Sequence, residues 1–171
     1  MEFWDVITRR QSVRSYLDKP VPEDKIKKIL EAARLAPSAH NRQPWKFIVV
    51  KDPEKRRKMM QACYNQPMIA QAPVLIVGVA LNTDWKMPNG ITSYPVDLAI
   101  AMEHITLAAT NEGLGSCWVG AFNQEQVKQI MNVPERCTVV AVMPIGYSNQ
   151  NRDPAPRKSV EEIVCYESFQ E

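Results

Sequence analysis

The chain has 171 residues, of which 45% are hydrophobic and 23% are charged, as in a globular protein with a single domain over residues 1–171. Its 21 basic and 19 acidic residues nearly cancel, so no strong field favours binding to nucleic acid or to a membrane surface. The longest apolar run, residues 98–109, is interrupted by Glu103 and His104 and cannot cross a bilayer. Because Glu2 and Trp4 are unlike a signal peptide, we expect a cytoplasmic protein.

The cysteines and histidines indicate neither disulfides nor a metal site. The four cysteines are widely separated and form no C-x-x-C pair, so we expect free thiols in a reducing compartment. Two histidines cannot supply the ligand spacing of a zinc site.

In the first half of the chain, the apolar pattern predicts helices and one strand. Phe3, Val6 and Ile7 are at helical spacing, and acidic residues after Pro22 mark the start of a clearer helix that Pro37 ends. A strand over residues 46–51 and a charged helix over 54–62 follow.

In the second half, a continuous apolar run over residues 73–81 predicts a strand that is buried on both faces. A turn-rich connection over 82–94 leads to a helix over 96–112 with Asp97 as its expected N-cap and Gly113 as its C-cap. This helix is apolar nearly all round and must be buried all round, which suggests a dimer partner.

The remaining elements are shorter. Residues 116–122 and 138–147 are predicted strands, and between them Asn123 and Gln126 resemble a capping box that opens a helix. Residues 159–166 fit either a helical turn or a strand.

Two polar motifs are candidates for a binding site. Residues 36–47 are dense in amides and hydroxyls and contain no acid, which suits a planar, hydrogen-bonding ligand next to an anion. Arg10, Ser12 and Arg14 offer the guanidinium forks and the hydroxyl that bind a phosphate. On residue type alone, a solvated basic helix end and a polar turn remain open as alternatives.

These motifs, together with the Gly113–Phe122 segment and Arg157, resemble the nitroreductase family of FMN oxidoreductases. The resemblance implies an α+β fold, with a central mixed β-sheet flanked by helices, and an intertwined homodimer with two FMN sites at the interface. The sequence departs from the family pattern at two positions. Ala155 stands where many members carry a basic residue, and Met68 stands near where some larger members carry a lysine.

The resemblance assigns FMN contacts to several separate segments and assigns no catalytic side chain, because the flavin N5 carries the hydride. The backbone of Gly120 or Ala121 is expected to donate to N5, and the segment 37–39 is expected to approach the flavin of the other subunit. The expected cofactor-binding residues are Arg10, Gln11, Ser12, Arg14, Pro37, Ser38, Ala39, Asn41, Gln43, Asn65, Gly120, Ala121 and Arg157.

The implied activity is ping-pong transfer of hydride from NADH or NADPH, through FMN, to a small flat acceptor such as a nitroaromatic, a quinone or an enone. The short connection 82–94 predicts an open acceptor site bounded by Trp85, Met87 and Tyr94. The alternatives are an FMN-binding protein that senses or fragments flavin, and a cofactor-free interaction dimer.

Overall fold

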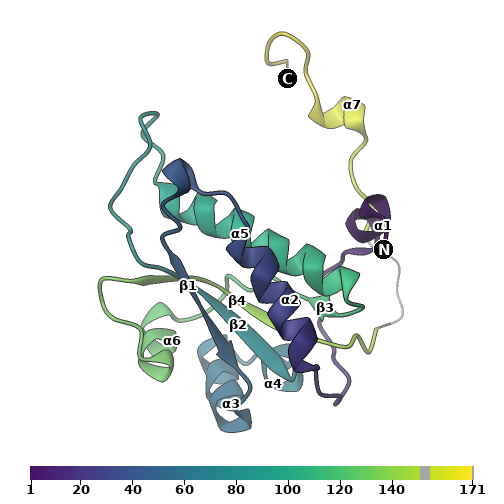
Figure 1. Cartoon of the computed structure of the whole chain (residues 1–171), viewed down its shortest axis with the longest axis vertical. Helices are drawn as coiled ribbons and strands as arrows, with labels where there is room; N and C mark the ends of the chain where they lie inside the picture. Colours follow the sequence, from purple (N-terminus) through teal and green to yellow (C-terminus); the bar gives the residue numbers. More distant parts are fainter. Residues whose placement is uncertain (151–154, 171) are drawn as a thin grey trace.

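A computed structural model describes residues 1–150 and 155–170, and it is built around one β-sheet (Figure 1). The strands lie in the order β1-β2-β4-β3, and they are β1 (Trp45–Val50), β2 (Val74–Ala80), β3 (Gly115–Ser116) and β4 (Thr138–Gly146). The helices are α1 (Phe3–Arg9), α2 (Glu23–Arg34), α3 (Pro53–Ala62), α4 (Pro67–Gln71), α5 (Ser93–Asn111), α6 (Gln124–Met131) and α7 (Val160–Ile163), with a 3-10 turn η1 (Ala39–Asn41).

The expected α+β class is confirmed. All three pairings between the named strands are antiparallel, and among the described residues parallel pairing is limited to an isolated bridge between Ser12 and Ser116. The sheet is therefore mixed only through that one bridge, which joins the Arg10–Arg14 segment to β3.

Two separate hydrophobic cores lie on the two faces of the sheet. Helices α2 and α5 cover one face, and residues of α3, α4 and α6 form the core on the other. The central strand β2 is buried at all seven positions, as the unbroken apolar run predicted. The sheet therefore separates the loops on the α5 side from those on the α3 side, and candidate binding residues lie on both sides.

Helix α5 begins earlier than its sequence predicted. Its first residue is Ser93, so Pro95 lies in the first turn, where its missing N–H costs nothing. The assignment of Asp97 as N-cap is therefore wrong, because Thr92 occupies that position and Asp97 lies inside the helix. Gly113 does adopt the left-handed conformation of a helix end, with φ +74°.

Strand β3 is much shorter than the predicted strand over 116–122. Ser116 pairs with Ile145 and Val119 pairs with Val142, so one register runs through both pairs. Between them the register places Cys117 opposite Pro144, which has no N–H to donate, and the ladder is interrupted there.

The structure also shows the helix start expected at Asn123 and a helix start after Ser159. Asn123 caps α6 by accepting a hydrogen bond from the Gln126 N–H at 3.0 Å. The ambiguous segment after Ser159 forms a helical turn, α7, with a capping box in which Glu162 accepts from the Ser159 N–H at 2.8 Å. Helix α4 has no counterpart among the predicted elements.

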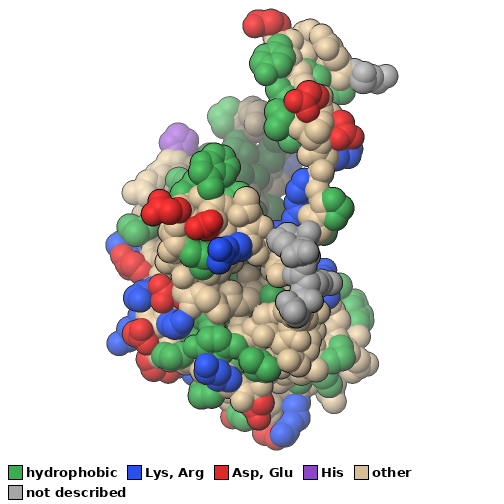
Figure 2. Space-filling view, turned by 90° about the vertical axis from the view of Figure 1, so that its right-hand side faces the viewer, with side chains coloured by type: hydrophobic (Ala, Val, Ile, Leu, Met, Phe, Trp, Pro, Cys, Tyr) green, Lys and Arg blue, Asp and Glu red, His purple; other side chains and the backbone are tan. Residues whose placement is uncertain are grey.

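The C-terminal segment stands apart from the body (Figures 1 and 2). Val160, Ile163, Tyr166 and Phe169 are between 62% and 85% exposed, although all four are large and apolar. Exposed apolar side chains of this size are unfavourable in water.

One of the buried thiols leads to a chemical prediction. Burial raises the pKa of Cys63 to about 12, and its side chain is inaccessible. Because the thiolate is the reactive form, Cys63 in the native protein is expected to resist iodoacetamide at pH 9 and to react fully in guanidinium. Peptide mass mapping of both samples checks this; equal modification of Cys63 in the two would contradict its burial.

Candidate functional site

The Arg10–Arg14 segment is held by backbone hydrogen bonds at its C-terminal end. The Val13 N–H donates to the Ser116 carbonyl at 2.9 Å, and the Arg14 N–H donates to Gln150 Oε1 at 3.0 Å. Arg10, Gln11 and Ser12 are half-buried and Arg14 is exposed. The backbone of the proposed phosphate-binding segment is thus fixed independently of any ligand.

A buried tyrosine adds to this anchoring. The Tyr16 hydroxyl lies 2.9 Å from the Val13 carbonyl and 3.1 Å from the Pro144 carbonyl, so it donates between the segment and β4. Burial raises the pKa of Tyr16 well above its usual range, which keeps the hydroxyl protonated as a donor.

Gly120, Ala121 and Asn65 form a second group on the side of α3. Gln66 Nε2 donates to the Ala121 carbonyl at 3.0 Å, which links the two segments, and Asn65 has a left-handed backbone with φ 57°. All three residues are exposed, and within residues 1–150 and 155–170 the N–H groups of Gly120 and Ala121 donate to no protein acceptor. A Cβ on Gly120 would meet nothing closer than 3.8 Å, so its backbone is open to a ligand.

The segment 37–43 forms a third group, on the side of α5. Ser38 Oγ accepts from the Gln43 N–H at 2.9 Å, and Gln43 Nε2 donates to Asn41 Oδ1 at 3.1 Å. The Gln43 amide therefore orients Asn41, whose side chain is exposed. Pro37 is exposed as well, and Ala39 is half-buried.

Asp97 anchors this loop, a role that its sequence position did not suggest. It is 3% exposed; its Oδ1 accepts from the Ala39 N–H at 2.8 Å, and its Oδ2 accepts from the Ser93 hydroxyl. Ala39 and Asp97 are 58 positions apart in the sequence, so no local pattern could reveal this contact.

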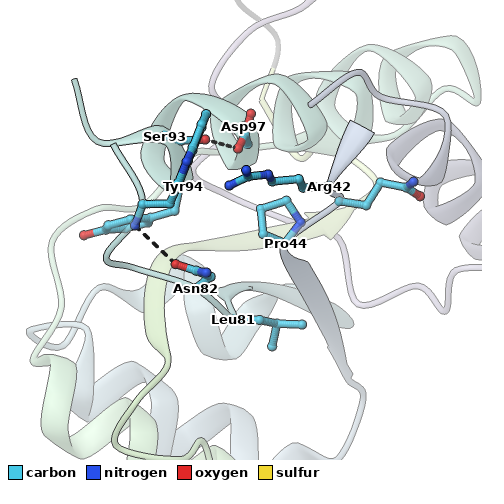
Figure 3. A pocket seen from close by; sticks show the side chains of 9 residues that line it. Arg42, Pro44, Leu81, Asn82, Ser93, Tyr94 and Asp97 are labelled. Atoms are coloured by element: carbon cyan, nitrogen blue, oxygen red, sulfur yellow. Dashed lines mark hydrogen bonds between the residues drawn. The ribbon is translucent and has the colours of Figure 1, made fainter. Parts of the chain in front are cut away.

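A cavity of about 250 Å³ lies between the end of this loop, the 82–94 connection and α5 (Figure 3). Of the three residues expected to bound an acceptor site, Trp85 and Tyr94 line this cavity, while Met87 is not among its lining residues. Arg42 enters it from the loop and lies over the Trp85 ring, 4.0 Å from the ring centroid.

Within residues 1–150 and 155–170, Arg157 forms no hydrogen bond with the other candidate residues. Its Nη1 donates to the carbonyls of Ala155 and Pro156, at 3.2 and 3.4 Å, and its side chain is otherwise exposed. Its expected contact with phosphate stays a prediction.

The fold and these exposed donor groups define an α+β protein with a polar site divided among several loops. A family model described as the Nitroreductase family matches residues 7–67 and 61–147. The chain belongs to the nitroreductase family.

Individual relatives match over most of their length. A protein of Archaeoglobus fulgidus named as an NADH dehydrogenase/NAD(P)H nitroreductase is 38% identical, over 86% of both chains. The Bacillus subtilis protein named FMN reductase, NAD(P)H, is 31% identical over 95% of this chain and 72% of its own. An FMN-dependent nitroreductase structure from Clostridium difficile R20291 superposes with a TM-score of 0.85 at 30% identity, covering 96% and 98% of the two chains.

Proposed function

We propose that this chain binds FMN and is an NAD(P)H-dependent oxidoreductase that passes hydride through the flavin N5 to a flat acceptor such as a nitroaromatic, a quinone or an enone, by a ping-pong mechanism. Family membership and the names of the relatives support the cofactor and the reductant. The single observation that carries the proposal is the pair of exposed, unused N–H groups at Gly120 and Ala121, where the sequence predicted a donor to N5.

The chemistry of the residues on the Arg10–Arg14 segment supports FMN binding. Arg10, Ser12 and Arg14 lie on one anchored segment and offer charged and neutral donors to a phosphate. The segment is bridged to β3, which leads within a few residues to the open backbone of Gly120. In this arrangement the side chains would position the cofactor, and the backbone N–H groups would stabilise negative charge that develops next to them.

We further propose that two copies of the chain are needed for each flavin ring. The ring contacts expected from Asn65 and Ala121 lie on the α3 side of the sheet, whereas those from Ser38 and Asn41 lie on the α5 side, anchored to Asp97. A flat ring cannot reach both sides of one sheet. A partner copy that supplies its own 37–41 segment removes this conflict.

The surface supports the same assembly. Phe3 and Ile7 of α1, with Leu107 and Ala108 of α5, line an open apolar groove of about 280 Å³. The apolar C-terminal segment after Ser159 projects away from its own body (Figure 2), as a segment that packs on a second copy would. None of the helices in residues 1–150 and 155–170 is long and apolar enough to span a bilayer, and a cytoplasmic location stays part of the proposal.

The test removes the expected phosphate contacts. Arg10→Ala and Arg157→Ala are each expected to weaken FMN binding about 10-fold, because each removes a charge-assisted hydrogen bond. The flavin-to-protein ratio after gel filtration and the dissociation constant for added FMN measure this. Arg34→Ala is the matched control, since Arg34 is an exposed surface residue paired with Glu31.

Anaerobic addition of NADH, and then of NADPH, to the purified wild-type protein separates the candidate functions. Bleaching followed by turnover of a quinone supports the oxidoreductase. A flavin that stays oxidised would indicate binding without reductase activity. A colourless protein that FMN does not reconstitute, or unchanged FMN affinity in both arginine variants, would overturn the site assignment.

A further inference from the structure

The cavity beside the 37–43 loop has one wall that carries a positive charge. Arg42 extends into it from the loop, with Asp97 and Ser93 of α5 on one side and Asn82 on the other (Figure 3). Its guanidinium lies over the Trp85 ring at 4.0 Å from the centroid. This cation–π contact holds the guanidinium at the cavity, and no hydrogen bond to a described residue uses its N–H donors.

This charge is not neutralised by an ion pair. Arg42 has no carboxylate oxygen within 4.0 Å among residues 1–150 and 155–170, in contrast to Arg34 and Arg57, which pair with Glu31 and Glu54. A guanidinium that is held in place without a counter-ion is a pre-organised site for an anion, and a carboxylate matches its fork with two parallel hydrogen bonds.

Asp97 also borders the cavity, but it does not act as the counter-ion of Arg42. Each of its oxygens already accepts a hydrogen bond, from Ala39 and from Ser93 respectively, and its side chain is buried. Its acceptors are directed at the loop and at its own helix. Arg42, by contrast, uses no side-chain donor on a described residue, so its donors are the ones that face a ligand.

The other walls fit one aromatic ring. Trp85, Tyr94, Pro44 and Leu81 supply aromatic and apolar surface. At about 250 Å³, the cavity is smaller than the usual ligand pocket, whose volume is roughly 300–1,000 Å³. This volume favours a single substituted ring over a dinucleotide.

We propose that this cavity selects acceptors of one chemical class, single-ring aromatic carboxylates, with Arg42 binding the carboxylate. The inference rests on the proposed function and narrows its flat acceptors to those that carry a carboxylate on a single ring. Arg42 is here a specificity-determining residue, and it takes no part in hydride transfer.

The first experiment measures binding without turnover. Benzoate and benzamide differ in charge but hardly in shape, and calorimetric titration of the FMN-loaded protein gives both affinities. Arg42→Gln is expected to weaken benzoate binding about 10-fold or more while benzamide changes less than about twofold, since only benzoate makes the charged hydrogen bonds. Arg136→Gln, which removes an exposed arginine at a different cavity, is the matched control.

A second variant changes the charge without removing Arg42. Asn82 Oδ1 accepts hydrogen bonds from the Asp84 and Trp85 N–H groups, at 3.2 and 3.3 Å, and a carboxylate oxygen can accept both. Asn82→Asp therefore keeps the turn but places a negative charge in the cavity. It is expected to weaken benzoate about as much as Arg42→Gln does and to spare benzamide.

The second experiment links binding to the reaction, with 4-nitrobenzoate and 4-nitrobenzamide as acceptors. The first two-electron step oxidises one NAD(P)H to NAD(P)⁺, consumes one proton, reduces the nitro group to nitroso and releases one water. In Arg42→Gln the kcat/KM for 4-nitrobenzoate is expected to fall about 10-fold through KM, with 4-nitrobenzamide unchanged.

The outcomes separate this inference from the proposed function. Equal binding of benzoate and benzamide by the wild type, or benzoate binding unaffected by Arg42→Gln, overturns the inference even if the enzyme turns over. A selective rise of KM for NADPH over NADH in Arg42→Gln, with benzoate binding unchanged, overturns it in favour of a nucleotide phosphate. If the protein binds benzoate selectively but NAD(P)H cannot reduce its flavin, carboxylate binding in the cavity is supported and the proposed oxidoreductase activity is contradicted.

Discussion

Replacing Gly115 with alanine is expected to lower the free energy of unfolding by about 3 kcal/mol, the upper end for overpacking. A Cβ at this position would lie 2.5 Å from Val13 Cγ2 and 2.8 Å from Val13 Cβ. The Cβ of Val13 cannot rotate away, because it is fixed to a backbone that hydrogen-bonds to Ser116 on the same strand. The strand β3 or the Arg10–Arg14 segment must therefore move.

Gly78→Ala is the matched control, at another strand glycine with a close neighbour. Its Cβ would meet Leu98 Cδ2 at 2.7 Å and Met102 Sδ at 3.0 Å, which are the far ends of flexible side chains. These atoms can rotate aside, so we expect a change of about 1 kcal/mol or less. Thermal unfolding of both variants at the same protein concentration measures the difference, which corresponds to roughly 4–8 °C in Tm.

The Gly115 variant also tests how closely the site depends on this contact. Val13 lies between Ser12 and Arg14, so its displacement is expected to weaken FMN binding as well as the fold. Adding Val13→Ala removes the two γ-methyl groups and is expected to recover part of the stability, as a coupling energy between the two positions. A Gly115→Ala protein that melts like Gly78→Ala would show that the segment yields freely and is not held by β3.

The elements that the sequence predicted well are those whose signals are local. The run over 73–81 is apolar at every position because both faces of β2 are covered, and Asn123 caps α6 from three residues away. Gly113 follows the end of α5 because this position has a left-handed backbone, which glycine adopts more easily than other residues. Such features depend on neighbours in the chain, so they can be read without knowing the fold.

The errors came from contacts between distant segments. The short β3 follows from its register against Pro144, and the inward position of Asp97 follows from the 37–43 loop that it binds. The end of a strand and the use of a carboxylate depend here on partners that only folding brings near.

The candidate site divides in the same way. Motif resemblance identified the residues now found in anchored or exposed positions, among them Ser12, Asn41 and Gly120. It did not single out Arg42, because one arginine in a polar loop carries no signal until its stacking on Trp85 and the cavity are seen. Asp97 was overlooked for a related reason, since acidic residues near a helix start are usually caps.

Asp97→Ala is expected to lower the free energy of unfolding by about 2–3 kcal/mol and to weaken FMN binding by about 10-fold. The change leaves the Ala39 N–H and the buried Ser93 hydroxyl without their shared acceptor. The loop also has left-handed backbone at His40, Asn41 and Gln43, with φ of 52°, 53° and 49°.

Such conformations cost of order 1 kcal/mol or more each for residues other than glycine, so they persist only while the surroundings enforce them. Loss of the Asp97 anchor is therefore expected to let the loop relax and to misplace Asn41.

Two conservative variants separate the anchoring of the loop from general destabilisation. Asp97→Asn keeps an oxygen for the Ala39 N–H and is expected to retain most of the FMN affinity. Ser93→Ala removes the other hydrogen bond, costs about 1 kcal/mol, and leaves the loop anchored. Hydrogen exchange of the peptide covering residues 37–43 provides the direct readout, with faster exchange expected in Asp97→Ala and not in Ser93→Ala. Equal exchange in these two variants would mean that Asp97 supports the helix and not the loop, and the loop geometry would then have to come from the Ser38–Gln43 and Gln43–Asn41 hydrogen bonds alone.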